Sequence, residues 1–358
     1  MTTRATSPIA DTTFSVHWQQ LTCYLEEAWP AGLTQFFQAL PQAQIKTIAH
    51  AVGDGRRVRA HLLCLVNAAL GGRIDDALPR ALAIECIHAA SLIHDDYVDQ
   101  DNIRRLRPAT WIVEGPRQAV LLGDIIFATA ILRMVELSRA DGLVVAETIA
   151  TMAHGAYREL LDPNELNEQL DRKRPNMALY DQLIHLKTGT LFAAAAKLGA
   201  MAAGASDETC ARAFRFGALF GEAYQIADDL DDIVALEDDW YAASSKLQCL
   251  LPAFLYFYDN EFSAAWLLKE NSTALQHWFK RESAILKARM AREIARRTDL
   301  AVNELEHFPT NSHAAWLRFA PKEILRNRAH ETGARPQRGF DVNVISARAA
   351  SCSPALGQ

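Results

Sequence analysis

Two acidic motifs stand out as residues whose types and spacing could do chemistry. Both read Asp-Asp-x-x-Asp, and their members are Asp95, Asp96 and Asp99 in the first and Asp228, Asp229 and Asp232 in the second. Positions i, i+1 and i+4 of a helix project from nearly the same side, so each motif gathers three carboxylates. Crowded carboxylates at the end of an apolar segment repel one another, and a hard divalent cation relieves that repulsion. Two such motifs facing one cavity predict Mg²⁺ bound together with a diphosphate.

A single acidic motif has other interpretations. It could be a solvated acidic face or the acidic first turn of a helix. A calcium loop is disfavoured, because the glycine expected at the sixth position of an EF-hand loop is missing. Two copies, each preceded by an apolar helical segment, favour the metal–diphosphate interpretation.

Basic residues accompany the acidic motifs. Arg104 and Arg105 follow the first motif, and Arg56 and Arg57 lie where a loop enters a predicted helix. A guanidinium group binds two phosphate oxygens through its planar fork, and a helix N-terminus attracts anions. Either pair alone is typical of a solvated basic face. Together with the aspartates, they indicate two separate diphosphate pockets.

Several polar residues are further candidates. Lys187, Thr188 and Lys246 are possible donors, and Gln225 shares the helical face of the second motif. His88 lies six residues before His94, so the two imidazoles need not face the same way. Taken alone they would be packing histidines.

The elements that must position these residues are helical. From about residue 15 to residue 305 apolar residues recur at helical spacing, and no segment alternates strictly as a strand does. Breaks are expected near Pro30-Ala31-Gly32, Gly53-Asp54-Gly55, Gly71-Gly72, Gly115-Pro116, Asp162-Pro163, Arg174-Pro175 and Gly204-Ala205-Ser206. We therefore expect one all-α domain over residues 1–326. Residues 327–358 lack this periodicity and are expected to form a flexible extension.

The composition limits the class of protein. Half of the 358 residues are apolar, and the net charge of −6 argues against a nucleic-acid binder. The six cysteines are scattered without a CxxC pair, which disfavours a zinc site or a disulfide framework. No window is apolar enough for a transmembrane segment, and the first residues do not resemble a signal peptide. These features predict a cytoplasmic protein.

From roughly Gly53 to Pro252 the chain resembles the trans-isoprenyl diphosphate synthase (polyprenyl synthetase) family. The resemblance rests on several motifs in order, namely Gly55-Arg56-Arg57, His88 with Ser91-Leu92-Ile93-His94-Asp95-Asp96, Arg104-Arg105, Leu122-Gly123-Asp124, Lys187-Thr188-Gly189 and Gln225-Ile226-Ala227-Asp228-Asp229.

This resemblance implies an isoprenoid synthase helical bundle around a central cavity, usually as a homodimer. It implies that Mg²⁺ is held on an allylic diphosphate by Asp95, Asp96, Asp99, Asp228, Asp229 and Asp232. Arg104, Lys187 and Lys246 would assist, with Thr188 and Gln225 near the reacting carbons. Isopentenyl diphosphate would be bound by Arg56, Arg57, His88 and Arg105. The diphosphate would leave, the isopentenyl double bond would attack the allylic cation, and a proton would then be lost.

Two features bear on the product and the rate. Residues 233–245, between the second motif and Lys246, form a stretch that is short for the family and lacks its usual lysine, so closure over the allylic diphosphate is expected to differ. Leu106 stands where the family has a glycine. Small residues before the first motif, Ala90 and Ser91, favour geranylgeranyl diphosphate over longer products, with farnesyl diphosphate third; Phe127 from another helix could close the cavity.

Two other functions compete with this one. A class I terpene cyclase would use similar metal chemistry, but it should lack the second basic pocket and usually has an Asn/Ser/Glu metal motif. A non-catalytic subunit of a heteromeric prenyl synthase would fit the short stretch after Asp232. Against it, both acidic motifs are complete.

Overall fold

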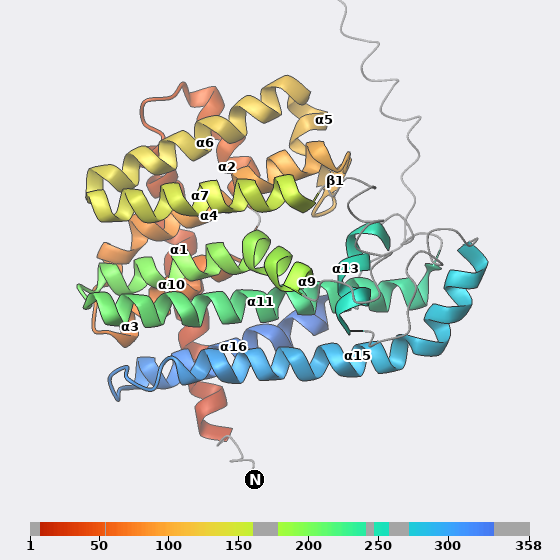
Figure 1. Ribbon diagram of the computed structural model, residues 1–358. Helices are drawn as coiled ribbons and strands as arrows, with labels where there is room; N and C mark the ends of the chain where they lie inside the picture. The colour runs from red at the N-terminus through yellow and green to blue at the C-terminus, as the bar shows by residue number, and fades with distance from the viewer. Residues whose placement is uncertain (1–7, 54, 160–177, 241–246, 258–271, 333–358) are drawn as a thin grey trace, which may run out of the picture.

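The computed structural model describes residues 8–53, 55–159, 178–240, 247–257 and 272–332 (Figure 1). These residues are almost entirely helical, which confirms the predicted all-α class. The elements in chain order are α1 (Pro8–Phe36), α2 (Gln42–Gly53), α3 (Val58–Ala69), α4 (Ile74–Val98), β1 (Ile103–Arg104), β2 (Arg107–Pro108), α5 (Thr110–Glu114), α6 (Pro116–Leu137), α7 (Arg139–Glu159), α9 (Ala178–Ile184), η1 (His185–Gly189), α10 (Thr190–Ala202), α11 (Asp207–Asp238), α13 (Leu247–Phe257), α15 (Ser272–Asn303) and α16 (Ser312–Thr332).

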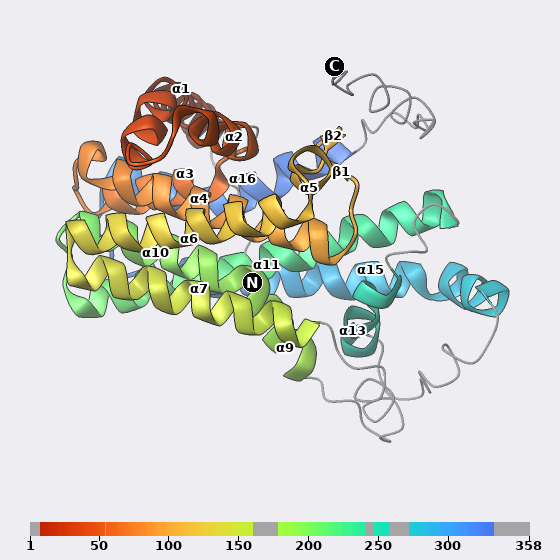
Figure 2. The same ribbon diagram turned by 90° about the horizontal axis from the view of Figure 1, so that it is seen from above.

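The long helices pack side by side in layers. Helix α4 packs on α3 and α6, α10 packs between α3 and α11, and α11 packs on α15. Figures 1 and 2 both show α4 and α11 running in the same direction, so that their C-terminal ends lie at the same end of the bundle. This arrangement positions the site, because both acidic motifs occur in the C-terminal parts of these two helices.

Two hydrophobic cores stabilise the bundle. The larger core is formed by α1, α2, α3, α4, α6, α7, α10 and α16 together with the first half of α11 and the end of α15. The smaller core joins α9, α13, the first part of α15 and the second half of α11, and its rings include Tyr180, Trp240 and Phe279. The second acidic motif lies on α11 beside the smaller core, because Ile226 and Ile233 of that core flank it.

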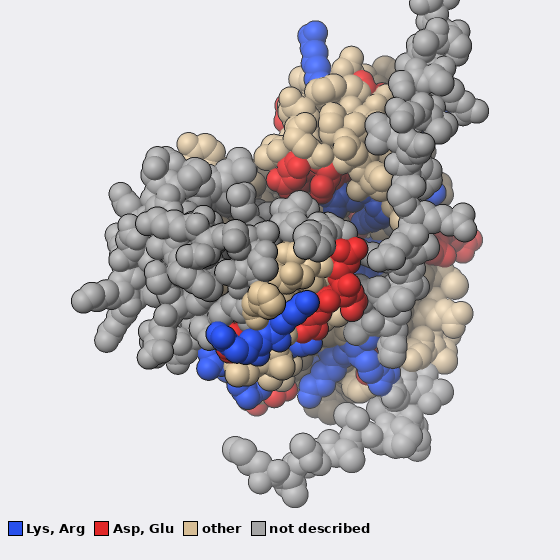
Figure 3. Space-filling view, turned by 90° about the vertical axis from the view of Figure 1, so that its right-hand side faces the viewer, with Lys and Arg blue, Asp and Glu red and all other residues tan. Residues whose placement is uncertain are grey.

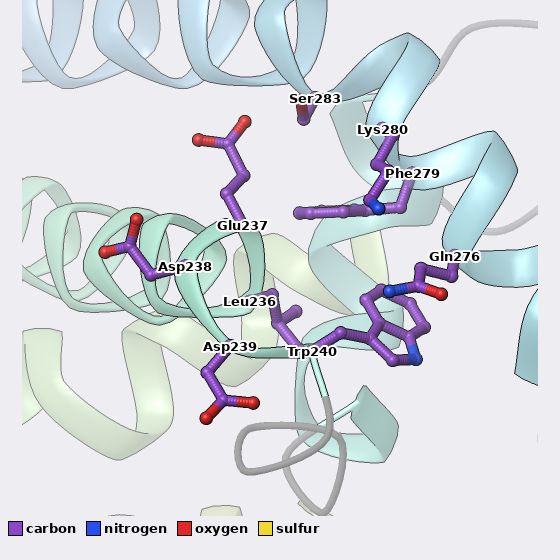
Figure 4. A pocket seen from close by; sticks show the side chains of 9 residues that line it. All are labelled: Leu236, Glu237, Asp238, Asp239, Trp240, Gln276, Phe279, Lys280 and Ser283. Carbon is purple, nitrogen blue, oxygen red and sulfur yellow. The ribbon is translucent and has the colours of Figure 1, made fainter. Parts of the chain in front are cut away.

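A surface cavity of about 450 Å³ opens beside the smaller core, where α11 ends against α15 (Figure 4). Figure 4 shows the rings of Trp240 and Phe279 on one side of it and the carboxylates of Glu237 and Asp238 on the other. Glu237 pairs with Lys287 of α15. Residues 236–240 of the short stretch 233–245 line the cavity, and residues 241–245 of that stretch fall outside the described part of the chain.

The breaks expected near Gly53-Asp54-Gly55, Gly71-Gly72, Gly115-Pro116 and Gly204-Ala205-Ser206 are confirmed by helix ends. Those near Asp162-Pro163 and Arg174-Pro175 lie outside the described residues. The break expected at Pro30-Ala31-Gly32 is wrong. Helix α1 continues through Pro30 to Phe36. Proline lacks one helical N–H donor, yet Trp29 and Leu33 on either side are buried and anchor this turn. A Cβ on Gly32 would lie 2.7 Å from Leu82 of α4, so the glycine permits close helix packing here rather than ending the helix.

Three further differences concern local structure. A two-residue antiparallel hairpin pairs Arg104 with Arg107, although no strand was expected. Its turn residues Arg105 and Leu106 have φ values of 50° and 62°, in the left-handed region. Helix α16 runs to Thr332 and so passes the boundary expected at residue 326, while residues 333–358 lie outside the described residues.

No helix in the described ranges is long and apolar enough to cross a bilayer.

Candidate active site

The two acidic motifs face the same end of the bundle. Asp99 caps the C-terminus of α4, whereas the second motif lies within α11, which continues to Asp238. Figure 3 shows this end of the molecule, where acidic side chains gather in two groups with basic side chains between them. A diphosphate placed between the groups would therefore meet carboxylates and cations together.

In the first motif, Asp96 is already satisfied by the protein. Its side chain is 3% exposed, and it accepts a hydrogen bond of 2.7 Å from Nε of Arg104 and a second from the same guanidinium. The hairpin that carries Arg104 therefore docks onto the end of α4 through this ion pair. Asp95 is half-buried and Asp99 is exposed, so these two carboxylates are nearer to a ligand arriving from solvent.

In the second motif, Asp229 is held by two protein side chains. It accepts hydrogen bonds from the Tyr180 hydroxyl at 2.6 Å and from the Gln225 amide at 2.9 Å. Thr188 in turn donates to the Gln225 carbonyl oxygen. The pKa of Asp229 is raised to about 6: burial and the nearby charge of Asp228 raise it, while Tyr180, Gln225 and Lys187 oppose the shift. A cation near Asp229 would restore its charged form.

Lys187 and Thr188 belong to η1, a π-helical turn of five residues. The backbone N–H of Thr190 donates a hydrogen bond to the His185 carbonyl oxygen, five residues earlier. The Thr190 hydroxyl donates to the same oxygen at 2.9 Å. Single π-turns within α-helices often occur at functional sites. Here the turn places Thr188 against Gln225, so the predicted neighbours Lys187, Thr188 and Gln225 are indeed brought to the second motif.

The predicted basic residues divide into two groups. Arg56 donates to the Tyr224 hydroxyl at 2.8 Å, beside the second motif. Arg57 instead donates to the Gly53 carbonyl oxygen at 2.9 Å, and its guanidinium lies 4.6 Å from the ring centre of Trp29. The Arg57 side chain therefore contacts α1 and α2.

Arg59, which the sequence analysis did not select, occupies the place expected of Arg57. Its guanidinium lies 4.6 Å from the ring centre of Phe192, and Glu85, Tyr224 and Asp228 are its electrostatic neighbours. Its Nε is buried without a hydrogen-bond partner in the described part of the protein. A charged residue inside the otherwise apolar run of α3 was the signal that could have identified it.

His88 lies close to Arg59, Arg104 and Arg105. Burial holds its pKa well below the ordinary value, and the positive charges of Arg59, Arg105 and Arg104 lower it further. The Arg105 guanidinium would lie 3.3 Å from a Cβ on Gly55, so the glycine of the loop permits its approach. Arg59, Arg105 and neutral His88 thus form a site with excess positive charge, suited to an anion.

The donor set fits Mg²⁺ rather than a metal held by protein alone. Among the described residues, no three His, Cys, Asp or Glu side chains converge closely enough to hold a metal ion. Magnesium takes one or two carboxylates and completes its shell with water and phosphate oxygens, so Asp95, Asp99, Asp228 and Asp232 fit that requirement when a diphosphate is present. Lys246 lies outside the described residues.

The residues expected to set the cavity depth lie on α4 and α6. Ala90 is fully buried, and the Ser91 hydroxyl is turned back onto the His88 carbonyl oxygen at 2.9 Å. The ring of Phe127 packs against His94, with centres 5.6 Å apart. Phe127 therefore contacts His94, which comes directly before Asp95 of the first motif.

The chain is similar to known proteins over the region that holds these residues. A family model described as polyprenyl synthetase matches residues 42–240. A geranylgeranyl diphosphate synthase of Methanosarcina mazei is 35% identical over 190 residues, which cover 51% of this chain and 56% of the relative. A nonaprenyl diphosphate synthase of Mycobacterium tuberculosis is 34% identical over 187 residues, covering 52% and 53%.

A solved structure is similar over a greater length. It is the polyprenyl synthase of Caulobacter crescentus complexed with calcium and isoprenyl diphosphate, which is 26% identical, with a TM-score of 0.65 and coverage of 84% of this chain and 95% of that one. By sequence, the chain spans only about half the length of the two curated relatives. Those relatives also differ in product length, so similarity alone does not assign a product.

Proposed function

Because this chain belongs to the polyprenyl synthetase family, we propose that it is a magnesium-dependent prenyltransferase. It would join isopentenyl diphosphate to an allylic diphosphate and release a linear all-trans prenyl diphosphate. The observation that carries the proposal is the presence of two different anion sites at one end of the bundle. One is built from carboxylates and needs a metal, and the other is built from arginines and a neutral histidine.

The first site would take the allylic diphosphate. Asp95, Asp96 and Asp99 of α4 and Asp228, Asp229 and Asp232 of α11 would hold the metal ions, with Asp96 and Asp229 set in place by their protein partners. Bound Mg²⁺ supplies charge stabilisation for the departing diphosphate. Arg104, Lys187 and Lys246 would add positive charge, and Thr188 and Gln225 would lie near the allylic carbons.

The second site would take isopentenyl diphosphate. Arg56, Arg59 and Arg105 would contact its phosphate oxygens, and a neutral His88 could donate one hydrogen bond without adding charge. We include Arg59 here in place of Arg57, because the Arg57 side chain is directed toward Trp29. The two substrates would then be held side by side, which lowers the barrier by orienting the double bond toward the cation.

The released proton needs an acceptor but no nucleophilic side chain. The departing diphosphate is the nearest strong acceptor once the allylic bond has broken, because it leaves with its negative charge beside the new carbon–carbon bond. The Thr188–Gln225–Asp229 chain of hydrogen bonds lines this place and keeps the amide oriented. The residues of the chain thus bind and orient the two substrates.

For the product we propose geranylgeranyl diphosphate. The residues before the first motif, Ala90 and Ser91, are small, and Phe127 contacts His94. Longer products rank second and farnesyl diphosphate third. Substituting Phe127→Ala should lengthen the product if its ring limits the cavity, and sizing of the dephosphorylated alcohols would show it.

We also propose that the protein is a cytoplasmic homodimer. Helix α6 exposes an apolar stripe, and α7 exposes Leu143 beside it; the stripe comprises Leu121, Ala128, Leu132 and Val135. Apolar stripes of this kind mark interaction surfaces, and a second copy of the chain would cover it. The described cysteines, Cys23, Cys64, Cys86 and Cys210, are free, which suits a reducing compartment.

A product assay tests the proposed function. Purified protein and Mg²⁺ are incubated with labelled isopentenyl diphosphate and, separately, dimethylallyl, geranyl or farnesyl diphosphate. We expect linear alcohols after dephosphorylation, and their loss in the Asp95→Asn, Asp228→Asn double variant. No isopentenyl incorporation with any starter would contradict the proposal; a cyclic hydrocarbon would then indicate a cyclase, and activity restored only by a partner protein would indicate a subunit.

A further inference from the structure

A buried arginine behind the second motif binds three carboxylates from three helices. Arg297 of α15 is 7% exposed, and its Nε donates to Glu293 of the same helix at 2.8 Å. Its two terminal nitrogens donate to Glu222 of α11 and to Asp181 of α9. Only a guanidinium carries donors in a planar fork that can serve three partners at once. Arg297 therefore ties α9 and α11 to α15.

Glu222 contacts both Arg297 and the π-turn. Its second carboxylate oxygen lies 2.8 Å from Nδ1 of His185, the first residue of η1. The backbone of η1 is packed tightly at the same place, because a Cβ on Gly189 would lie 3.1 Å from Cγ of Glu222. A shift of Glu222 would therefore displace the turn that carries Lys187 and Thr188.

A second series of contacts leads from Arg297 through Asp181 and Tyr180 to Asp229. Asp181 is adjacent to Tyr180, whose hydroxyl donates to Asp229 at 2.6 Å. Tyr256 of α13 packs on Tyr180, with ring centres 5.1 Å apart, and its hydroxyl interacts electrostatically with Arg297. Both routes from Arg297 thus end on groups that line the proposed allylic site.

We propose that Arg297, Glu222 and His185 are positioning residues for the allylic diphosphate. They hold the π-turn in register with α11, so that Lys187, Thr188 and Gln225 meet the substrate together. None of the three touches the substrate. The proposal rests on the proposed function for the identity of the ligand. It predicts that substituting these residues weakens binding of the allylic diphosphate but not binding of isopentenyl diphosphate.

The first test compares two neighbouring arginines. Arg297→Lys keeps the positive charge but loses the planar fork that spreads the donors toward three helices, whereas Arg296→Lys alters an arginine that is 57% exposed and pairs with Glu293. The probe is geranyl thiolodiphosphate, a non-reacting allylic diphosphate, titrated by calorimetry with Mg²⁺ present. We expect Arg297→Lys to raise its Kd and lower kcat about tenfold or more, since small misplacements of a site have large effects. Arg296→Lys should match the wild type.

A second pair of variants covers the case in which Arg297→Lys does not fold. The His185 side chain is 39% exposed, so His185→Ala should leave the fold intact. We expect His185→Ala to raise the Kd of the thiolodiphosphate, and His185→Gln to restore it because its amide can still donate to Glu222. The KM for isopentenyl diphosphate should change by less than about twofold in every variant, a split that general loosening would not produce.

The outcomes separate this proposal from the proposed function. It is overturned if His185→Ala binds the probe as the wild type does, if His185→Gln gives no rescue, or if both substrates are weakened equally. A wild type that makes no prenyl chain, yet loses probe binding on His185→Ala, would contradict the proposed function and leave the positioning role intact.

Discussion

Protein side chains hold at least one carboxylate in each acidic motif. Asp96 is bound by Arg104, and Asp229 is bound by Tyr180 and Gln225. These partners fix rotamers before any ligand arrives, which reduces the entropy lost on binding. The sequence revealed the aspartates because their spacing fits a helix face. It did not separate Arg57 from Arg59, because the choice depends on where α3 begins: Arg57 is the N-cap residue with φ of 48°, and Arg59 lies inside the first turn.

This difference gives a prediction for the isopentenyl site. Arg59→Gln should raise the KM for isopentenyl diphosphate by about tenfold or more, because it removes a charged hydrogen-bond donor from a buried anion site. Arg57→Gln, the matched control on the same turn, should change it by less than about threefold. Steady-state kinetics with the allylic substrate saturating would measure both. Equal effects of the two substitutions would contradict the assignment.

The stability of the protein should depend on the protonation of His61. Burial lowers its pKa to about 4 from 6.5, and its Nδ1 donates to the Arg57 carbonyl oxygen at 2.7 Å. Below pH 6.5 the unfolded chain binds a proton that the folded protein does not, so the free energy of unfolding falls as the pH falls from 6.5 through 4. Between pH 7 and pH 5 this loss is about 2 kcal/mol.

Urea denaturation at the two pH values would measure it. His61→Asn keeps a donor for the Arg57 carbonyl but cannot bind the proton, so its loss of stability over this range should be smaller than that of the wild type. His154→Asn, at an exposed position on α7, is the control and should follow the wild type. Identical pH dependence in His61→Asn and wild type would show that His61 does not contribute.

At the scale of elements, tertiary packing determined the secondary structure at the places where the local sequence predicted it wrongly. The Pro30-Ala31-Gly32 sequence predicts a break, yet α1 passes through it because Trp29 and Leu33 are buried against the larger core. The hairpin β1–β2 could not be predicted, because its turn lacks the Asn-Gly or Asp-Gly sequence typical of such hairpins. Arg105 and Leu106 adopt the left-handed conformation that those residues usually occupy. Its docking through Arg104 and Asp96 offsets that local strain. The π-turn has no sequence signature at all.

Helix α1 should be more stable without its internal proline. Pro30→Ala supplies the missing N–H donor and removes the ring's clash with the preceding turn, so the free energy of unfolding should rise by about 1–2 kcal/mol, less than the full penalty because proline also restricts the unfolded chain. Denaturant titration would measure this rise. Gly217→Ala, inside α11, is the contrasting variant and should destabilise, because its Cβ would lie 2.3 Å from the Phe192 backbone carbonyl oxygen. A stability loss in Pro30→Ala would contradict this account of the turn.

At the scale of the whole molecule, two cores meet beside the second motif. The larger core holds the first motif and the arginine–histidine site, and the smaller core supports Tyr180 and the far end of α11. The all-α class and the order of the motifs could be predicted from the sequence, because helical periodicity and spacing are local. The smaller core could not, since it joins α9, α13 and α15 across long separations in the chain.

The apolar stripe on α6 gives a prediction about assembly. Leu132 and Val135 are 54% and 51% exposed, so their substitution should not disturb the core. The Leu132→Glu, Val135→Glu double variant should be monomeric, because it places charges in the centre of the proposed dimer interface. Light scattering after gel filtration would report the mass. Arg139→Glu, on the exposed start of α7, is a control for added negative charge, and a wild type that is itself monomeric would contradict the proposed dimer.

The most direct measurement of the central claim is the binding of both substrates with and without metal. Calorimetry with geranyl thiolodiphosphate and isopentenyl diphosphate, titrated alone and in the presence of the other, reports whether the chain has two diphosphate sites. We predict that each binds once per chain and that neither displaces the other. Removing Mg²⁺ with a chelator should abolish binding of the allylic analogue, while the Kd of isopentenyl diphosphate changes by less than about threefold. Competition for a single site, or binding of the allylic analogue that ignores the chelator, would contradict the account.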